Sequence, residues 1–150
     1  MAVMRERPYD GSSFLVSLGE QDGRAAAAGF AEVVFPPFVL DQARGQTSEA
    51  VRTAMAQAPD RPAAQRLVLR RGVTGSLDLY RWWNEARRAP TPPTRTVTIE
   101  LLADDHETVA LTWRFEGAYP VSVSYSPLRA LDGGIVMETV ELAFDRVEMS

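Results

Sequence analysis

The chain has 150 residues, of which 45% are hydrophobic and 24% charged, a balance that favours one compact domain over a disordered chain. Its net charge of −4 and pI of about 5.0 argue against a general nucleic-acid-binding protein, which usually carries a basic balance. The absence of cysteine excludes a disulfide framework, a thiolate nucleophile and a thiolate metal site. No stretch approaches the roughly 18 to 20 apolar residues of a membrane span, and no apolar run follows the charged start, so the sequence predicts neither a transmembrane segment nor a signal peptide.

The first half of the chain is predicted to be rich in strands. Short runs of apolar and β-branched residues, bounded by turn residues, predict strands over residues 13–18, 28–35 and 65–70. Residues 19–24 (GEQDGR) form the expected turn between the first two, and Pro36 and Pro37 end the second because proline cannot donate a ladder hydrogen bond. Residues 41–62 show no clear pattern and are compatible with a short helix over 49–57 or with a loop.

One amphipathic helix is predicted after the third strand. Ser76 is the expected N-cap and Asp78 lies in the first turn, while Arg87 and Arg88 lie in the last turn, so the charges match both ends of the helix dipole. Residues 89–93 contain three prolines and end the helix. Three large residues at helical spacing are expected to pack the helix against the body: Leu77, Tyr80 and Trp83.

The second half shows the clearest alternation of apolar and polar residues. Residues 96–102 and 110–116 each place apolar side chains on one face and polar ones on the other, and residues 104–106 (DDH) form the expected hairpin turn between them. Further strands are predicted over 121–125 and, after an Asp-Gly-Gly turn, as one long strand over 135–147. The pattern predicts a mainly β, antiparallel domain with one helix.

Candidate catalytic chemistry is sparse. His106 is the only histidine and stands in an Asp-Asp-His-Glu turn, which is compatible with a metal or acid–base site but is also an ordinary solvated hairpin tip. Without a second histidine, a nucleophile elbow or a Gly-rich phosphate loop, the sequence predicts no catalytic residue, no metal site and no cofactor. The basic and aromatic residues that could grip a nucleic acid are more simply explained as core or interface: Arg70, Arg71, Arg87, Arg88, Trp82 and Trp83.

Glu138 interrupts an apolar row in the final predicted strand. By the period of two it shares a face with Val136, Val140 and Leu142. A buried charge is unfavourable unless it is paired, so we expect Glu138 to form an ion pair with an arginine, Arg70 or Arg71, of the same or a neighbouring subunit.

Several of these segments, taken in order, resemble the tail-tube protein family of contractile phage tails and extracellular contractile injection systems. The resemblance extends over most of the chain and depends on the order and spacing of its motifs. The matching segments are FLVSLG, AGFAEV (28–33), LVLRRGVTGSLDLYRWWNEAR (67–87), TVTIELLADD, ALTWRFEGAYPVSVSYSPLRAL and IVMETVELAFDRVE (135–148).

The resemblance implies a single tail-tube-like domain over residues 1–150. Its expected fold is two packed antiparallel sheets forming a β-barrel or sandwich with one flanking α-helix. Its expected function is structural, without catalysis: hexameric rings stack into a hollow tube inside a contractile sheath, and sheath contraction drives the tube through a target envelope. The implied partners are further copies of the chain, the sheath, baseplate or spike and tube-cap proteins, and protein cargo in the lumen, with no specific nucleic-acid binding. The implied site of assembly is the bacterial cytoplasm, in a phage-tail-like particle.

Under this resemblance, two sets of residues are expected at functional surfaces. The expected subunit-interface residues are Arg70, Arg71, Glu138, Phe35 and Phe38. The expected lumen-facing residues are the polar members of the predicted hairpin: Thr98, Glu100, Thr112, Arg114 and Glu116.

Two departures from the family pattern keep alternatives open. Residues 34–39 read VFPPFV where the family has a small Gly-containing turn, and residues 41–62 lack its Tyr-x-x-Gly signature. A specialised ring that starts the tube on the baseplate, or ends it, is therefore one alternative to the principal tube subunit. From another class of protein, a monomeric β-barrel binding module with one pocket is the second alternative.

Overall fold

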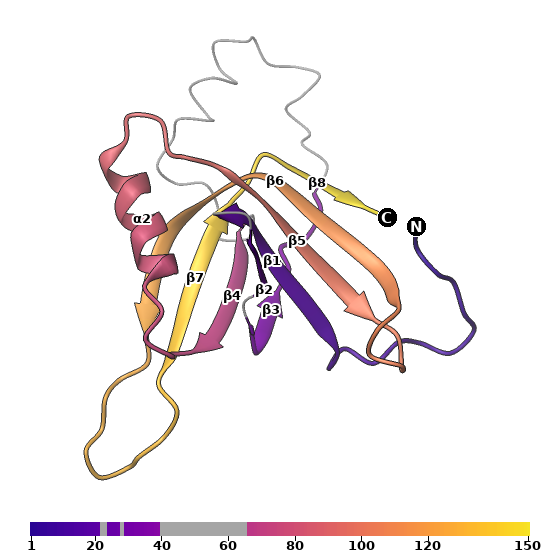
Figure 1. Cartoon of the computed structure of the whole chain (residues 1–150), viewed down its shortest axis with the longest axis horizontal. Helices are drawn as coiled ribbons and strands as arrows, with labels where there is room; N and C mark the ends of the chain where they lie inside the picture. The colour runs from indigo at the N-terminus through magenta and orange to yellow at the C-terminus, as the bar shows by residue number, and fades with distance from the viewer. Residues whose placement is uncertain (22–23, 28, 40–65) are drawn as a thin grey trace.

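The computed structural model describes residues 1–21, 24–27, 29–39 and 66–150. The described chain consists mainly of β-strands and their connections, with one helix after the fourth strand (Figure 1). In chain order the elements are β1 (Phe14–Gln21), β2 (Arg24–Ala27), β3 (Glu32–Val34), β4 (Leu67–Gly72), α2 (Asp78–Arg88), β5 (Arg95–Leu102), β6 (Val109–Tyr125), β7 (Met137–Ala143) and β8 (Arg146–Met149). The helix suggested over residues 49–57 lies outside the described residues.

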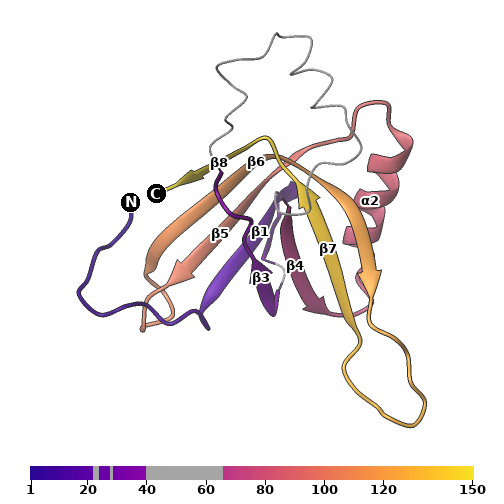
Figure 2. The ribbon, with the colours of Figure 1, turned by 180° about the vertical axis from the view of Figure 1, so that it is seen from behind.

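The strand β6 belongs to both layers of the fold. Its first half pairs with β5 and β8, and its second half pairs with β7, so the first sheet has the order β2-β1-β5-β6-β8 and the second β6-β7-β4-β3. All strand pairs are antiparallel. Figures 1 and 2 show the two sheets joined along β6 and spreading apart from it. The predicted fold of two packed antiparallel sheets with a flanking helix is confirmed in its sandwich form, because the described strands follow an open path and do not close into a barrel.

The crossing from one sheet to the other takes place at Gly117. This residue has a φ of +67°, a conformation that glycine adopts readily because it has no Cβ. Asp145 lies against it and donates its backbone N–H to the carbonyl oxygen of Glu116 at 2.9 Å. The two strands predicted over 110–116 and 121–125 are therefore one bent strand, and the prediction of one final strand over 135–147 is wrong: the chain leaves β7 and begins β8, in the other sheet, beside this bend.

The strands near the start of the chain also differ from the prediction. β1 continues to Gln21 and pairs with β2, with Gln21 opposite Arg24, so the strand-to-strand turn is shorter than the predicted turn over 19–24. The predicted strand over 28–35 is reduced to β3, whose neighbour is β4. By contrast, the hairpin over 96–116 is confirmed, with Ile99 opposite Trp113.

The hydrophobic core fills the space between the two sheets and under the helix. The first sheet, the second sheet and α2 contribute side chains that are at most 2% exposed: Val16, Leu18, Val97, Ile99, Phe115, Leu67, Leu69, Val140, Leu142, Leu79 and Trp82. Alternate residues of β4, of most of β7 and of the middle of β5 are buried, as expected for sheets with one covered face. No helix in the described part of the chain is long and apolar enough to cross a membrane.

Candidate functional site

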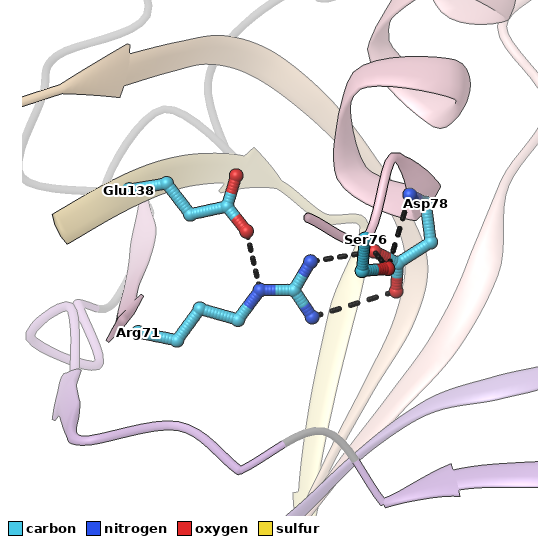
Figure 3. Close-up of polar contacts among 4 residues, drawn as sticks. All are labelled: Arg71, Ser76, Asp78 and Glu138. Carbon is cyan, nitrogen blue, oxygen red and sulfur yellow. Dashed lines mark hydrogen bonds and ion pairs between the residues drawn. The ribbon is translucent and has the colours of Figure 1, made fainter. Parts of the chain in front are cut away.

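Three charged side chains from separate elements meet at the start of α2 (Figure 3). Arg71 on β4 donates from Nε to Oε1 of Glu138 on β7 across 2.5 Å. The same guanidinium donates from Nη2 to Oδ1 of Asp78, the first residue of α2, also across 2.5 Å. The hydroxyl of Ser76 donates to the same carboxylate oxygen at 2.6 Å. One arginine therefore joins two neighbouring strands to the helix, an arrangement that we call the ion triad (Arg71, Glu138, Asp78).

Local sequence explains how the ion triad forms. The register of β4 and β7 places Arg71 directly opposite Glu138, on a face whose other members are apolar. Gly75, with a φ of +89°, turns the chain so that Asp78 returns to Arg71 only seven positions later. Ser76 does not cap the helix as predicted: α2 begins after Leu77 without a side-chain cap, and the Ser76 hydroxyl holds the Asp78 carboxylate instead.

The groups of the ion triad are held in their charged forms by one another. Arg71 is 6% exposed and Glu138 is 3% exposed. Burial alone would lower the pKa of Arg71, but the hydrogen bonds that it donates to Asp78 and Glu138 outweigh this effect, and the pKa is raised. Burial alone would likewise raise the pKa of Asp78, yet the hydrogen bonds from Arg71 and Ser76 hold it below its ordinary value. A permanently charged arginine between two hydrogen-bonded carboxylates is suited to stabilising structure and not to transferring protons.

A second polar arrangement covers the outer face of the first sheet. The register of β5 and β6 places Thr98 opposite Arg114 and Glu100 opposite Thr112. The side chains of the opposite face, including Val97 and Phe115, are fully buried in the core. The five residues predicted from the hairpin therefore lie together on one outward face, which we call the polar face (Thr98, Glu100, Thr112, Arg114, Glu116).

The strand β8 extends the polar face with further charges. Its register places Glu148 opposite Arg114 and Arg146 opposite Glu116. Arg146 lies 3.2 Å from Glu116 and 2.6 Å from Glu148, measured from guanidinium nitrogen to carboxylate oxygen. The polar face and β8 together therefore place acidic and basic side chains next to one another.

The hairpin turn around His106 is held by local hydrogen bonds. Asp105 accepts hydrogen bonds from the backbone N–H groups of Glu107 and Thr108, at 3.0 and 2.8 Å. The hydrogen bond from the Thr108 hydroxyl, followed by those from the backbone, lowers the pKa of Asp105 to about 2. His106 has a φ of 59° and its Nδ1 lies 2.8 Å from Oγ of Ser13. No group of three or more potential ligands that could hold a metal ion is present among the residues described, so the turn is explained by its own hydrogen bonds.

The family comparison decides the identity of this fold. The family model described as T4-like virus tail tube protein gp19 matches residues 12–148. The chain belongs to this family. No curated protein matches the sequence.

Solved structures show that the tail tube fold extends over the whole chain. A chain in the PVC sheath–tube complex, an extracellular contractile injection system in its extended state, has a TM-score of 0.71 at 22% identity, over 97% of this chain and 93% of that one. A chain in the tube-terminating cap of the anti-feeding prophage has a TM-score of 0.72 at 18% identity, over 100% and 95%. A chain in the baseplate of the same prophage has a TM-score of 0.64 at 19% identity, over 97% of each.

The residues expected at the subunit interfaces of this tail tube protein are only partly at its surface. The predicted pair of Glu138 with Arg70 or Arg71 is present, with Arg71 and within one chain. Because Arg71 and Glu138 are buried in the chain itself, neither presents a surface to a neighbour, which corrects their assignment to an interface. Arg70 is partly exposed, and its guanidinium lies 3.8 Å from the carboxylate of Glu32 on β3.

The two phenylalanines expected at an interface differ in their surroundings. Phe38 is 54% exposed. Phe35 is 38% exposed and its ring centroid lies 4.7 Å from that of Trp113 and 6.4 Å from that of Phe115. Phe35 thus closes one side of a groove of about 320 Å³ between β3 and the first sheet. We call it the apolar groove, lined chiefly by Phe14, Val33, Phe35, Ile99, Leu101 and Trp113.

The helix of the tail tube protein packs through a different face from the predicted one. The buried residues of α2 are Leu79, Trp82 and Ala86. Leu77 and Tyr80 are 53% and 44% exposed, so the prediction that Leu77, Tyr80 and Trp83 pack the helix against the body is wrong. Trp82 is fully buried, donates from Nε1 to the carbonyl oxygen of Pro93 at 3.2 Å, and lies under the guanidinium of Arg95 at 4.4 Å.

The exposed side of α2 forms its own aromatic surface. The ring centroids of Tyr80 and Trp83 lie 6.2 Å apart, and the guanidinium of Arg87 lies 5.2 Å from the Trp83 ring centroid.

The sequence did not predict Asp78 as a partner of Arg71. An acidic residue in the first turn of a helix is already explained by its favourable interaction with the helix dipole.

Proposed function

We propose that this chain is a structural subunit of the inner tube of a contractile, phage-tail-like particle. The observation that carries the proposal is the family match over residues 12–148. The matched range contains all the strands of the two sheets, apart from the last residue of β8. In the proposed assembly, copies of the chain form hexameric rings, and the rings stack into a hollow tube that sheath contraction drives through a target envelope. The role is structural and not enzymatic.

The open edges of the first sheet support assembly through strands. Within the described chain, β2 and β8 end this sheet, so each leaves one row of backbone hydrogen-bonding groups without a strand partner. Exposed edges of this kind are a liability in a monomer, and pairing across copies removes it. A contact between two different edges is heterologous, and it gives a closed ring when the rotation between copies closes.

The polar face supports an assignment to the lumen. It lies on the side of the first sheet opposite the core, and its charges are partly neutralised by one another: Arg146 lies near both Glu116 and Glu148. A lumen lined by Thr98, Glu100, Thr112, Arg114 and Glu116 would stay hydrated and would present mainly polar side chains to protein cargo.

The remaining partners follow from the same proposal. The similar solved chains come from a sheath–tube complex, a tube-terminating cap and a baseplate. We propose that this chain likewise contacts a sheath on its outer surface and cap and baseplate or spike proteins at the two ends of the tube, and that the particle assembles in the bacterial cytoplasm. The specialised initiator or terminal ring stays a second candidate, because the TM-score to the cap chain, 0.72, equals that to the sheath–tube chain within 0.01.

Negative-stain electron microscopy and mass photometry of the same purified sample test the proposal. Rings or hollow filaments are the expected result, and abundant long tubes would identify the principal subunit over an initiator. Short stacks that form only on added baseplate components would identify the specialised ring. A chain that stays monomeric over a wide concentration range, and also fails to join tubes when sheath and baseplate proteins are supplied, would contradict the proposal and favour a monomeric binding module that uses the apolar groove.

A further inference from the structure

The connection between β6 and β7 is an arm that projects from the body. Figures 1 and 2 both show residues 126–136 extending beyond the ends of the two strands, away from the rest of the chain. Its root is fixed: the backbone N–H of Ser126 donates to the carbonyl of Met137 at 2.9 Å, and that of Val73 donates to the carbonyl of Val136 at 2.8 Å. We refer to residues 126–136 as the arm.

The arm carries large apolar side chains that are mostly exposed to solvent. Leu128 is 82% exposed, Leu131 is 98% exposed and Ile135 is 80% exposed. Single exposed apolar residues are common on protein surfaces, but several on one projecting segment mark a contact with another surface. Because the burial of apolar surface is a main favourable contribution to association, the arm offers a substantial part of an interface.

The same chain carries a receiving surface of matching character. The apolar groove has a volume of about 320 Å³ and is lined by aromatic and aliphatic side chains of β1, β3, β5 and β6. Glu32 also lines it, and Glu32 and Arg70 face each other at 3.8 Å with half-exposed side chains. The groove therefore combines an apolar floor with one acidic residue in its lining, Glu32, next to which the basic group of Arg70 lies.

The charges of the arm complement the charges of Glu32 and Arg70. Arg129 and Asp132 lie 3.9 Å apart on the arm, with side chains 66% and 74% exposed. This pair and the pair of Glu32 with Arg70 are both longer than a hydrogen bond, so each group is available to a better partner. Docking the arm in the groove would place Arg129 against Glu32 and Asp132 against Arg70, while Leu128 and Leu131 fill the apolar floor.

We infer that the arm of one copy docks in the apolar groove of a neighbouring copy. The arm points away from its own body in both views, so its partner groove belongs to another molecule (Figure 2). The two surfaces come from different parts of the chain, which makes the contact heterologous and able to propagate around a ring or along a stack. This inference rests on the proposed tube function and names the residues of one of its contacts.

Disulfide cross-linking tests the inference, since the natural chain has no cysteine. Leu128→Cys in one copy and Val33→Cys in a differently tagged copy are mixed, allowed to assemble and oxidised. The expected product is a covalent heterodimer carrying both tags. The matched control pairs Leu128→Cys with Arg81→Cys, because Arg81 is exposed on α2, away from the groove. Equal yields from the two mixtures in assembled samples would overturn the inference.

Paired serine variants give a second readout that does not depend on cross-linking. Leu128→Ser with Leu131→Ser is expected to leave the unfolding midpoint unchanged, because both side chains are almost fully exposed. The concentration at which rings first form should rise about 10- to 100-fold for each leucine that is buried in the contact. The control is Leu15→Ser: Leu15 is 48% exposed on the polar face, opposite Glu100, and should not change the concentration for assembly.

Charge exchange tests the orientation of the arm. Arg129→Glu and Glu32→Arg are each expected to lower the cross-link yield, and their combination to restore it, by about two- to fivefold, the range of an exposed ion pair. Rings that form normally without a specific cross-link, and without an effect of the serine variants, would overturn the inference and leave the tube function intact, since another segment or partner would then cover the groove. A chain that never assembles, even with partner proteins, would overturn both.

Discussion

Asp145 lies directly against Gly117 at the point where β6 passes from the first sheet to the second. A Cβ atom built on Gly117 would lie 2.8 Å from Cγ and 3.1 Å from Cβ of Asp145. The same position has a φ of +67°, and Asp145 is the residue at which the chain leaves β7 for β8. The close packing of β6 against the connection between β7 and β8 thus requires a residue without a side chain at position 117.

We therefore expect Gly117→Ala to destabilise the fold more than Gly75→Ala does. Both glycines have a positive φ, which is unfavourable by about 1–2 kcal/mol for alanine. Only Gly117 adds a steric conflict, because nothing lies within 4 Å of a Cβ at Gly75. Urea unfolding of the unassembled chain measures the difference. Asp145→Ala in the Gly117→Ala background should recover part of the loss; equal effects of the two glycine variants would show that Asp145 moves freely.

The buried arginine–glutamate pair of the ion triad should contribute far more to the free energy of unfolding than an exposed arginine–glutamate pair does. Glu138→Gln keeps an oxygen that can accept from Nε of Arg71 but removes the negative charge of one partner in a buried pair, so we expect a loss of about 3–5 kcal/mol in the free energy of unfolding. Glu148→Gln is the matched control, because its pair with Arg146 is exposed and should contribute below about 1 kcal/mol. Chemical denaturation of both variants checks this, and losses of similar size would refute the stabilising role of the ion triad.

The helix offers a test between adjacent tryptophans. Trp82→Ala removes a fully buried side chain and should lower the free energy of unfolding by about 3–5 kcal/mol. Trp83→Ala removes a partly buried ring that lies near Tyr80 and Arg87, and the loss should be smaller, nearer about 1 kcal/mol. Thermal and urea unfolding of the two variants decide between them. The reverse order would restore Leu77, Tyr80 and Trp83 as the packing face.

The Asp78 carboxylate should make the free energy of unfolding depend on pH in the acid range. Its pKa in the folded chain lies below 3.8, because hydrogen bonds from Arg71 and Ser76 outweigh the effect of burial. A lowered folded-state pKa contributes stability that is present above the unfolded value and is lost as pH falls through the folded value. The difference in stability between the natural chain and Asp78→Asn should therefore be largest near pH 6 and shrink below pH 3.8. A difference that stays constant from pH 6 to pH 2 would contradict the stabilisation of the Asp78 carboxylate by Arg71.

The lumen assignment predicts protection of the polar face on assembly. Thr112→Cys introduces the only thiol of the chain on that face, and Arg81→Cys introduces one on the exposed side of α2. Both should react with a bulky maleimide reagent in the unassembled protein. In capped or long tubes Thr112→Cys should become slow to react while Arg81→Cys stays accessible. Equal reactivity in intact tubes would place the polar face on the outer surface.

The fold and the site could be predicted to different extents. Alternation along β5 and β6 was enough to place Thr98, Glu100 and Arg114 on one face, because the two-residue period of a strand is a local property. An isolated acid in the apolar row of β7 was likewise enough to require an arginine partner for Glu138. Neither pattern identified Asp78 as the second partner, since that contact depends on how Gly75 turns the chain toward the helix.

The sequence by itself determined the β-rich class, the single helix in the described chain, the family and the need to pair Glu138, because each follows from local periodicity, composition or ordered motifs. Only the tertiary structure decided which face of α2 is buried and where the last strand divides. Leu79, Trp82 and Ala86 are spaced for one helical face as well as Leu77, Tyr80 and Trp83 are, so the choice belongs to the sheet that covers the helix. The division between β7 and β8 is set by the bend at Gly117, more than twenty residues earlier in the chain. The sequence around residue 145 has no local pattern that predicts this bend.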